Sequence, residues 1–158
     1  VVALGIALGG TAPADTSMGV IAGEPTGVSL RQSVGTIASF DLALAWSFVD
    51  EGALYVHLDY QQYFREVDIS ESRFLFFLGI GPKVYINEEV DVGARIPVGI
   101  FYSLPRAPLE FFAEIVPGVS LYPETDFDLM GAIGMRYQFG SGWRRTPEGV
   151  SEPTTITE

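Results

Sequence analysis

Hydrophobic and polar residues alternate along most of the chain, and the alternation is clearest near its C-terminal end. From Phe127 to Phe139 every second residue is apolar, aromatic or glycine, and most residues between them are polar or small. Successive side chains of a β-strand point to opposite faces, so this pattern predicts a strand with one oily face and one polar face. The same alternation predicts seven further strands, at residues 18–23, 27–33, 40–48, 54–61, 74–86, 90–104 and 109–122.

Short connections separate these segments, so the simplest topology is an antiparallel up-and-down meander of eight strands. The longest polar connection that we predict is residues 65–73, and turn-forming residues mark the others. Pro82, Pro97 and Pro117 fall inside predicted strands. Because proline lacks the N–H that a ladder needs, we expect bulges or strand ends at these positions.

Composition indicates which solvent the oily face meets. Hydrophobic residues make up 47% of the chain and charged residues 18%, and the mean hydropathy is +0.27. No run approaches the roughly 18 apolar residues of a membrane helix. Apolar surface spread in alternation is typical of a transmembrane barrel, whose closure satisfies every strand edge. We therefore predict an all-β fold: an eight-stranded antiparallel up-and-down transmembrane β-barrel.

The barrel is predicted to span residues 16–139 as one domain. Residues 1–15 are predicted to be a signal-peptide remnant or a flexible leader, because an apolar run precedes an Ala-x-Ala pattern at Ala12 and Ala14. Residues 140–158 are rich in glycine, serine, proline, threonine and glutamate, which predicts a disordered polar tail.

Charged side chains of both signs lie on the polar face of the predicted strands. The interior of an eight-stranded barrel is only wide enough to be filled by side chains, and buried charges there must pair. We predict a sealed, salt-bridged interior in which Glu114 meets Arg136 and Arg95 meets Asp59, with a narrow ion path as the alternative. The predicted interior network consists of Arg31, Asp41, His57, Asp59, Arg73, Lys83, Asp91, Arg95, Glu110, Glu114, Asp128 and Arg136.

Aromatic residues of the oily face gather toward the strand ends. Such residues form the girdles of a barrel at the two membrane interfaces. The predicted interface aromatics are Phe40, Trp46, Phe48, Tyr60, Phe64, Phe74, Phe76, Tyr102, Phe111, Phe127, Tyr137 and Phe139.

Charge and residue counts exclude several functions. A net charge of −11 argues against nucleic-acid binding, because phosphate binding needs a basic surface. The chain has no cysteine and one histidine, so neither a disulfide scaffold nor a thiolate metal site is possible, and a transition-metal site is not expected. We predict no cofactor.

Several segments carry a resemblance to a known family. The runs MGVIAGEPTGVSLRQ, FDLALAWSF, LYVHLDY, RIPVGIFYSLP, PLEFFAEIVPG and DLMGAIGMRYQF resemble small bacterial outer-membrane barrels of OmpA-like or OmpX-like shape, a domain family of unknown function. The resemblance covers residues 18–139 and implies a place in the Gram-negative outer membrane, without established catalytic residues. Ile133, Met135, Tyr137 and Phe139 resemble the C-terminal insertion signal of such proteins, although there the last aromatic ends the chain.

We therefore predict a structural or interaction protein of the bacterial envelope that contacts the lipid bilayer and protein partners in a larger assembly. One alternative is a lipid-modifying enzyme that uses His57, with Asp59 on the same face and a hydroxyl such as Ser47 as nucleophile. In the predicted hairpin register, however, Ser47 faces Tyr55 and Ala45 faces His57, which does not place Ser47 beside the histidine. The other alternative is a soluble, lipocalin-like barrel that binds an apolar ligand, with the two faces exchanged.

Overall fold

The computed structural model describes residues 16–23, 26–46, 52–69 and 72–140. This part of the chain is all-β, and nine antiparallel strands pair into one sheet. The strands are β1 (Thr16–Gly23), β2 (Thr26–Val34), β3 (Ala38–Trp46), β4 (Leu54–Ile69), β5 (Ser72–Ile86), β6 (Val90–Arg95), β7 (Val98–Ser103), β8 (Leu109–Tyr122) and β9 (Asp126–Phe139).

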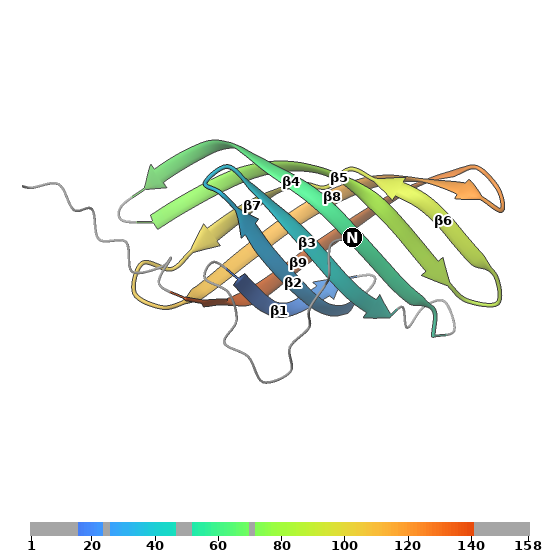
Figure 1. Ribbon diagram of the computed structural model, residues 1–158, viewed down its shortest axis with the longest axis horizontal. Helices are drawn as coiled ribbons and strands as arrows, with labels where there is room; N and C mark the ends of the chain where they lie inside the picture. Colours follow the sequence, from blue (N-terminus) through green and yellow to red (C-terminus); the bar gives the residue numbers. More distant parts are fainter. Residues whose placement is uncertain (1–15, 24–25, 47–51, 70–71, 141–158) are drawn as a thin grey trace, which may run out of the picture.

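The sheet closes into a ring. Strand β1 pairs with β2 on one side and with β9 on the other, so the first and last strands are neighbours. Strands β6 and β7 lie end to end between β5 and β8, because each of them pairs with both of these strands. The turns β5–β6 and β8–β9 lie at one end of the molecule, and the end of β4, the start of β5 and the β7–β8 connection lie at the other (Figure 1).

The predicted strand 90–104 is interrupted at Ile96 and Pro97, which separate β6 from β7. The cause is the missing N–H of Pro97, which cannot take part in a regular ladder. The backbone at the break is bonded to both neighbours instead: the Ile96 N–H donates to the Pro117 carbonyl at 2.9 Å, and the Pro97 carbonyl accepts from the Gly79 N–H at 2.8 Å. The expected strand end is therefore present at Pro97.

The other two prolines remain inside strands. Pro117 lies opposite Leu129 in the regular β8–β9 register, without a bulge at that point. Pro82 lies opposite Ala94 of β6, but the pairing of β5 with β4 skips from Lys83 to Ile80. The expectation of a bulge or a strand end is thus wrong for Pro117 within β8, although the partner of β8 changes beside it, from β7 at Ile115 to β6 at Gly118.

The predicted polar connection 65–73 is wrong. Strand β4 continues to Ile69 and β5 begins at Ser72, so the two form a long hairpin. A register shift between Tyr63 and Arg65 leaves Phe64 as an extra residue, and pairing resumes from Arg65 opposite Phe76. The charged residues of this segment predicted a loop, but the chain pairs regularly with β5 as far as Ile69. Strand β3 pairs with β4 only up to Gln62, with one further bond from Tyr63 N–H to the Ile37 carbonyl.

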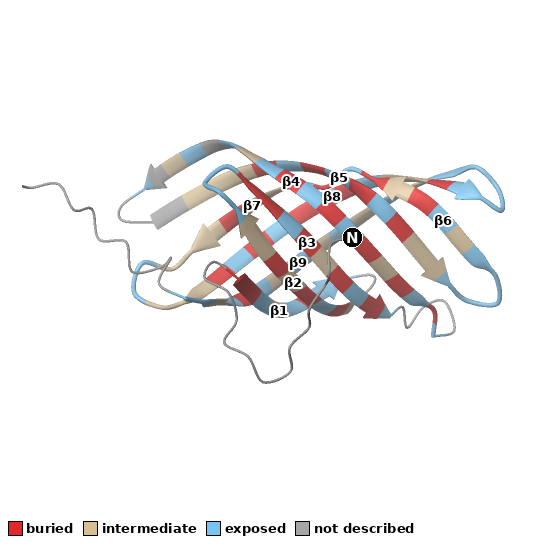
Figure 2. Cartoon of the chain, in the orientation of Figure 1, coloured by how far each residue is buried: buried red, intermediate tan, exposed pale blue. Residues whose placement is uncertain are grey.

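Burial alternates along the strands as the sequence pattern requires (Figure 2). Leu44, Ile96 and Phe111 are 43%, 45% and 41% exposed on the outer wall, whereas Arg95 is 3% exposed inside the ring. An apolar cluster fills part of the interior and consists of Ile21, Ala43, Phe77, Phe101 and Phe112. The predicted leader 1–15, the tail beyond residue 140, and the predicted Ser47 and Phe48 lie outside the described residues.

Candidate functional site

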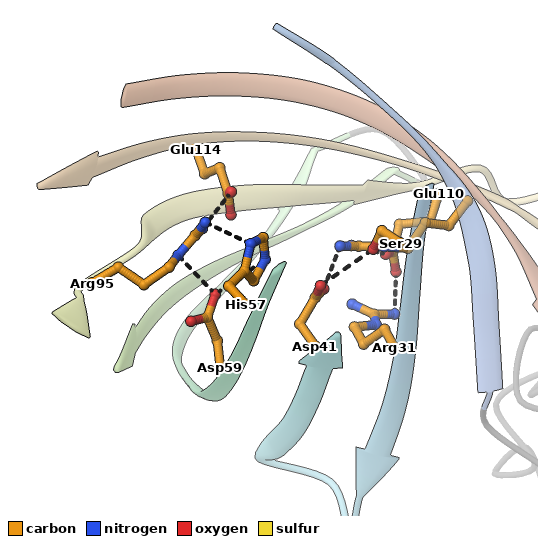
Figure 3. Close-up of polar contacts among 9 residues, drawn as sticks. Ser29, Arg31, Asp41, His57, Asp59, Arg95, Glu110 and Glu114 are labelled. Carbon is orange, nitrogen blue, oxygen red and sulfur yellow. Dashed lines mark hydrogen bonds and ion pairs between the residues drawn. The ribbon is translucent and has the colours of Figure 1, made fainter. Parts of the chain in front are cut away.

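A first cluster of buried charges is organised around Arg136 of β9. Its guanidinium donates through Nε to Ser29 Oγ at 2.8 Å, through Nη1 to Glu110 Oε1 at 3.4 Å and through Nη2 to Asp41 Oδ2 (Figure 3). Ser29 Oγ in turn donates to Asp41 Oδ1 at 3.2 Å. Arg136 is 1% exposed, so this side chain is fully enclosed and joins strands β2, β3, β8 and β9.

Arg31 completes the first cluster from β2. It donates to Glu110 Oε2, which also accepts from Gln138 Nε2 at 3.1 Å. The guanidinium carbon of Arg31 lies 4.4 Å from the centroid of the Phe101 ring. Phe101 stacks on Phe77 with 4.3 Å between ring centroids, so the charges rest on the apolar cluster. A cation held over an aromatic face in a dry interior is stabilised by about 2 kcal/mol.

A second cluster surrounds Arg95 of β6. Its Nη2 donates to Glu114 Oε1 at 2.9 Å, its Nη1 donates to the Tyr55 hydroxyl at 3.1 Å, and its Nε lies 3.2 Å from Asp59 Oδ2. The Arg95–Asp59 pair is the one that the sequence predicts. A cavity of about 20 Å³, lined in part by Tyr55, Arg95 and Glu114, has room for about one water molecule.

His57 lies inside the second cluster with its Nδ1 2.8 Å from Arg95 Nη1. A guanidinium can only donate, so Nδ1 uses its lone pair as acceptor and the proton of the neutral imidazole is on Nε2. Nε2 lies 3.6 Å from Asp59 Oδ2. Directly opposite His57 on β3 is Ala43, and Ala45 faces Tyr55. The predicted register was wrong by two residues, because the β3–β4 connection from Trp46 to Leu54 is longer than the turn we expected.

Lys83, Asp91 and Asp128 lie toward the end of the ring that holds the β5–β6 and β8–β9 turns. Lys83 is buried and forms an ion pair with the half-buried Asp128. Asp91 is half-buried, and its Oδ1 has no hydrogen-bond partner among the described residues. The side chain of Arg73 lies outside the described part of the chain.

The predicted pairing of Glu114 with Arg136 is wrong. In the β8–β9 register Glu110 lies opposite Arg136, whereas Glu114 lies opposite Ala132. Arg136 is occupied by Glu110 and Asp41, and Glu114 is bound by Arg95.

Four residues of these clusters were missing from the predicted network: Ser29, Tyr55, Phe101 and Gln138. Each has the strand parity of a predicted interior charge, for example Ser29 two residues before Arg31 and Tyr55 two residues before His57. From this shared parity the four residues could have been assigned to the interior network.

On the outer wall, the predicted interface aromatics contact one another across the strands. Ring centroids are 5.5 Å apart for Phe40 and Tyr60, 4.9 Å for Phe74 and Tyr102, and 6.5 Å for Tyr102 and Phe111. Two further contacts are Phe64 with Phe76 and Tyr137 with Phe139. Trp46 and Phe127 are exposed nearer the other end of their strands. The aromatic residues thus form a band around one end of the ring.

Above this band the wall is hollowed over small residues. Two adjoining apolar grooves of about 490 and 780 Å³ share Ala22, Ile100, Ala113 and Ile133. Within the described ranges, no three His, Cys, Asp or Glu residues are grouped in a way that could hold a metal ion. The described residues also include no helix with the length and apolarity that a membrane crossing requires.

Comparison with known proteins adds one finding. The fold is similar to the crystal structure of the N-terminal β-barrel domain of Pseudomonas aeruginosa OprF, with a TM-score of 0.57. The likeness covers 79% of this chain and 97% of that chain at 16% sequence identity. The sequence matches no described protein family and no curated protein. The likeness is one of fold, to a domain described as a β-barrel.

Proposed function

We propose that the chain is an eight-stranded transmembrane barrel of the Gram-negative outer membrane, in which β6 and β7 together act as one interrupted strand. Its role is structural or interactive: it anchors in the envelope and serves as a subunit or docking element of a larger envelope assembly. The proposal depends above all on one observation, the large apolar side chains that cover the outside of a closed ring.

The outer wall supports lipid as the surrounding solvent. Leu129 and Ile133 of β9 are 72% and 63% exposed, and Ile115 of β8, which lies opposite Gly131 between them, is 61% exposed. Soluble monomers rarely expose contiguous apolar patches larger than a few hundred Å². Closure of the ring satisfies the strand edges, as hydrocarbon demands, and the aromatic band has the position of an interface girdle.

The side chains inside the ring favour a filled interior over one with a cavity for a ligand. A lipocalin-like barrel requires large apolar residues around an internal cavity. Here Arg31, Arg95 and Arg136 are buried with their carboxylate partners and fill the centre. The lipocalin-like alternative requires the apolar face inside and the polar face outside, which is the opposite of the observed burial.

We propose no catalytic role for His57. A general base must offer a free ring nitrogen to a nucleophile within hydrogen-bond reach. Nδ1 of His57 is occupied by Arg95, Nε2 faces a carboxylate, and the small Ala43 lies opposite. The arrangement is that of a polar side chain satisfied within a charge cluster.

Membrane extraction tests the proposal. Membranes from cells expressing the full chain are washed with carbonate and with high salt, then treated with detergent. We expect the protein to stay in the pellet until detergent is added, and to migrate differently on gels before and after boiling. Release by carbonate alone, or identical migration of boiled and unboiled protein, would contradict it.

A further inference from the structure

The two central charge clusters hold one negative charge more than they can pair. Four buried carboxylates, those of Asp41, Asp59, Glu110 and Glu114, face three guanidiniums, those of Arg31, Arg95 and Arg136. Lys83 does not help, because it is paired with Asp128. His57 does not help either, since its contact with Arg95 requires the neutral imidazole.

The excess charge falls on Asp59, whose ion pair with Arg95 is the weaker of the two that this arginine makes. The side chain of Asp59 is 0% exposed, and neither of its carboxylate oxygens has a hydrogen-bond partner among the described residues. Its single arginine, Arg95, is shared with Glu114. The residue directly opposite on β3 is Asp41, a second carboxylate, which is already bound by Arg136. An ionised carboxylate in such a place is costly unless something compensates it.

Two further buried oxygens lie on the next rung of the same inward face. Ser39 lies opposite Gln61, and these residues are two positions from Asp41 and Asp59 on their strands. Ser39 Oγ and Gln61 Oε1 have no hydrogen-bond partner in the described structure, and the residues are 0% and 1% exposed. Side chains on neighbouring rungs of one face are within reach of each other.

The neighbouring strand offers these oxygens no side-chain partner. Gly79 and Gly81 of β5 run past Gln61 and Asp59. A Cβ at Gly81 would overlap Asp59 Oδ1, and a Cβ at Gly79 would come within 3.0 Å of Gln61 Cγ. Glycine at both positions lets the β5 backbone pass close to Asp59 and Gln61 without placing a side-chain donor or a cation beside their oxygens.

We propose that Ser39, Asp59 and Gln61 bind one small monovalent cation, with Na⁺ as the matching size and hardness, inside the ring. One carboxylate with neutral amide and hydroxyl oxygens forms a hard donor set with a single charge, which suits a monovalent ion and offers no soft ligand to a transition metal. The cation restores neutrality to the interior and satisfies four oxygen atoms at once. The inference needs the closed ring but not the membrane, so its failure would leave the proposed function standing.

The test uses the full chain folded in detergent. Its unfolding temperature is measured over a range of NaCl and of choline chloride at equal concentrations, since choline is too large for the site. A ligand that binds only the folded state raises its stability by mass action. We expect NaCl to raise the midpoint above that in choline chloride, and the difference to saturate.

Three variants locate the effect. Asp59→Asn should abolish the difference between the two salts, and Ser39→Ala should move half-saturation to several-fold higher Na⁺. Glu124→Gln, at an exposed carboxylate of the β8–β9 turn, should keep the wild-type response. If Asp59→Asn does not fold, the comparison of the two salts is made with Ser39→Ala and Gln61→Leu instead.

Equal midpoints in both salts, or an undiminished Na⁺ effect in Asp59→Asn, would overturn the proposal. A midpoint that follows pH but not Na⁺, with the pH response lost in Asp59→Asn, would overturn it in favour of a bound proton.

Discussion

The guanidinium carbon of Arg136 lies 3.8 Å from the centroid of the Phe112 ring, so the most buried cation of the ring rests on an aromatic face. Phe112 lies opposite Gly134 in the β8–β9 register, two residues from Arg136 on the same strand. The absence of a side chain at Gly134 therefore makes space for the ring that supports the arginine. Two predictions depend on this arrangement.

Arg136→Lys should destabilise the folded protein by about 1–3 kcal/mol, the cost of leaving buried hydrogen-bonding groups without a partner. A lysine ammonium cannot contact Ser29, Asp41 and Glu110 at once, since it lacks the planar fork of donors. Urea titration in detergent, followed by the folded gel band, measures the change. Arg106→Lys in the exposed β7–β8 connection is the control and should stay within about 0.5 kcal/mol. Equal midpoints for Arg136→Lys and the control would show that the first cluster adds no stability.

Gly134→Ala should be severely destabilising, whereas Gly131→Ala on the same strand should be tolerated. A Cβ at Gly134 would overlap the Phe112 ring and lie 2.6 Å from the Val20 carbonyl oxygen. A Cβ at Gly131 would meet nothing nearer than the Glu114 carbonyl oxygen at 3.8 Å. The same urea titration compares the two variants. The interpretation of Phe112 as a fixed support for Arg136 would fail if both alanines behaved alike.

Ile133→Arg tests which solvent surrounds the ring. Ile133 is 63% exposed near the middle of β9. Arginine on the lipid face at the bilayer midplane costs about 2–4 kcal/mol, whereas a surface substitution in water usually costs no more than about 0.5 kcal/mol. Refolding yield and unfolding midpoint in lipid vesicles measure the difference. Val90→Arg, at an exposed position beside the β5–β6 turn, is the matched control and should be mild.

His57→Gln should leave any lipid hydrolysis by the membrane fraction unchanged and should fold. The glutamine carbonyl oxygen can accept from Arg95 as Nδ1 does, so the second cluster keeps its contacts. Release of fatty acid from labelled phospholipid is the measurement, with His57→Ala as the variant that also removes the acceptor. A hydrolytic activity lost in both variants would restore the enzyme hypothesis.

The sequence predicted the faces of the strands far better than their partners. Parity alone placed Arg95, Glu110 and Arg136 on one face, because strand side chains alternate strictly. It could not tell that Arg136 meets Glu110 and Asp41, since this depends on the register between β8 and β9 and on the curvature that brings β3 across the interior. Arg31 and Glu110 are a further example, because their strands β2 and β8 are not neighbours in the ring.

Strand ends were predicted where proline or glycine marks them and missed where polarity alone was used. In residues 65–69 Glu66 and Asp68 alternate with Val67 and Ile69, as in a strand, but the three charged residues of this segment predicted a loop. The segment pairs regularly with β5. The break at Pro97 was expected because its cause is covalent. Its effect on the neighbours, with Gly79 and Pro117 bonding to it, depends on the ring and could not be read from local sequence.

The interruption between β6 and β7 lets the sheet bend while the backbone at the break stays hydrogen-bonded to both neighbouring strands. The Ile96 amide and the Pro97 carbonyl each find a partner on an adjacent strand, so these two backbone groups stay hydrogen-bonded at the break. One strand can thus change direction halfway along its length while the cylinder stays continuous. Proline is usually found on the edge strands of a sheet. Here Pro97 lies within a closed sheet that has no edge strand.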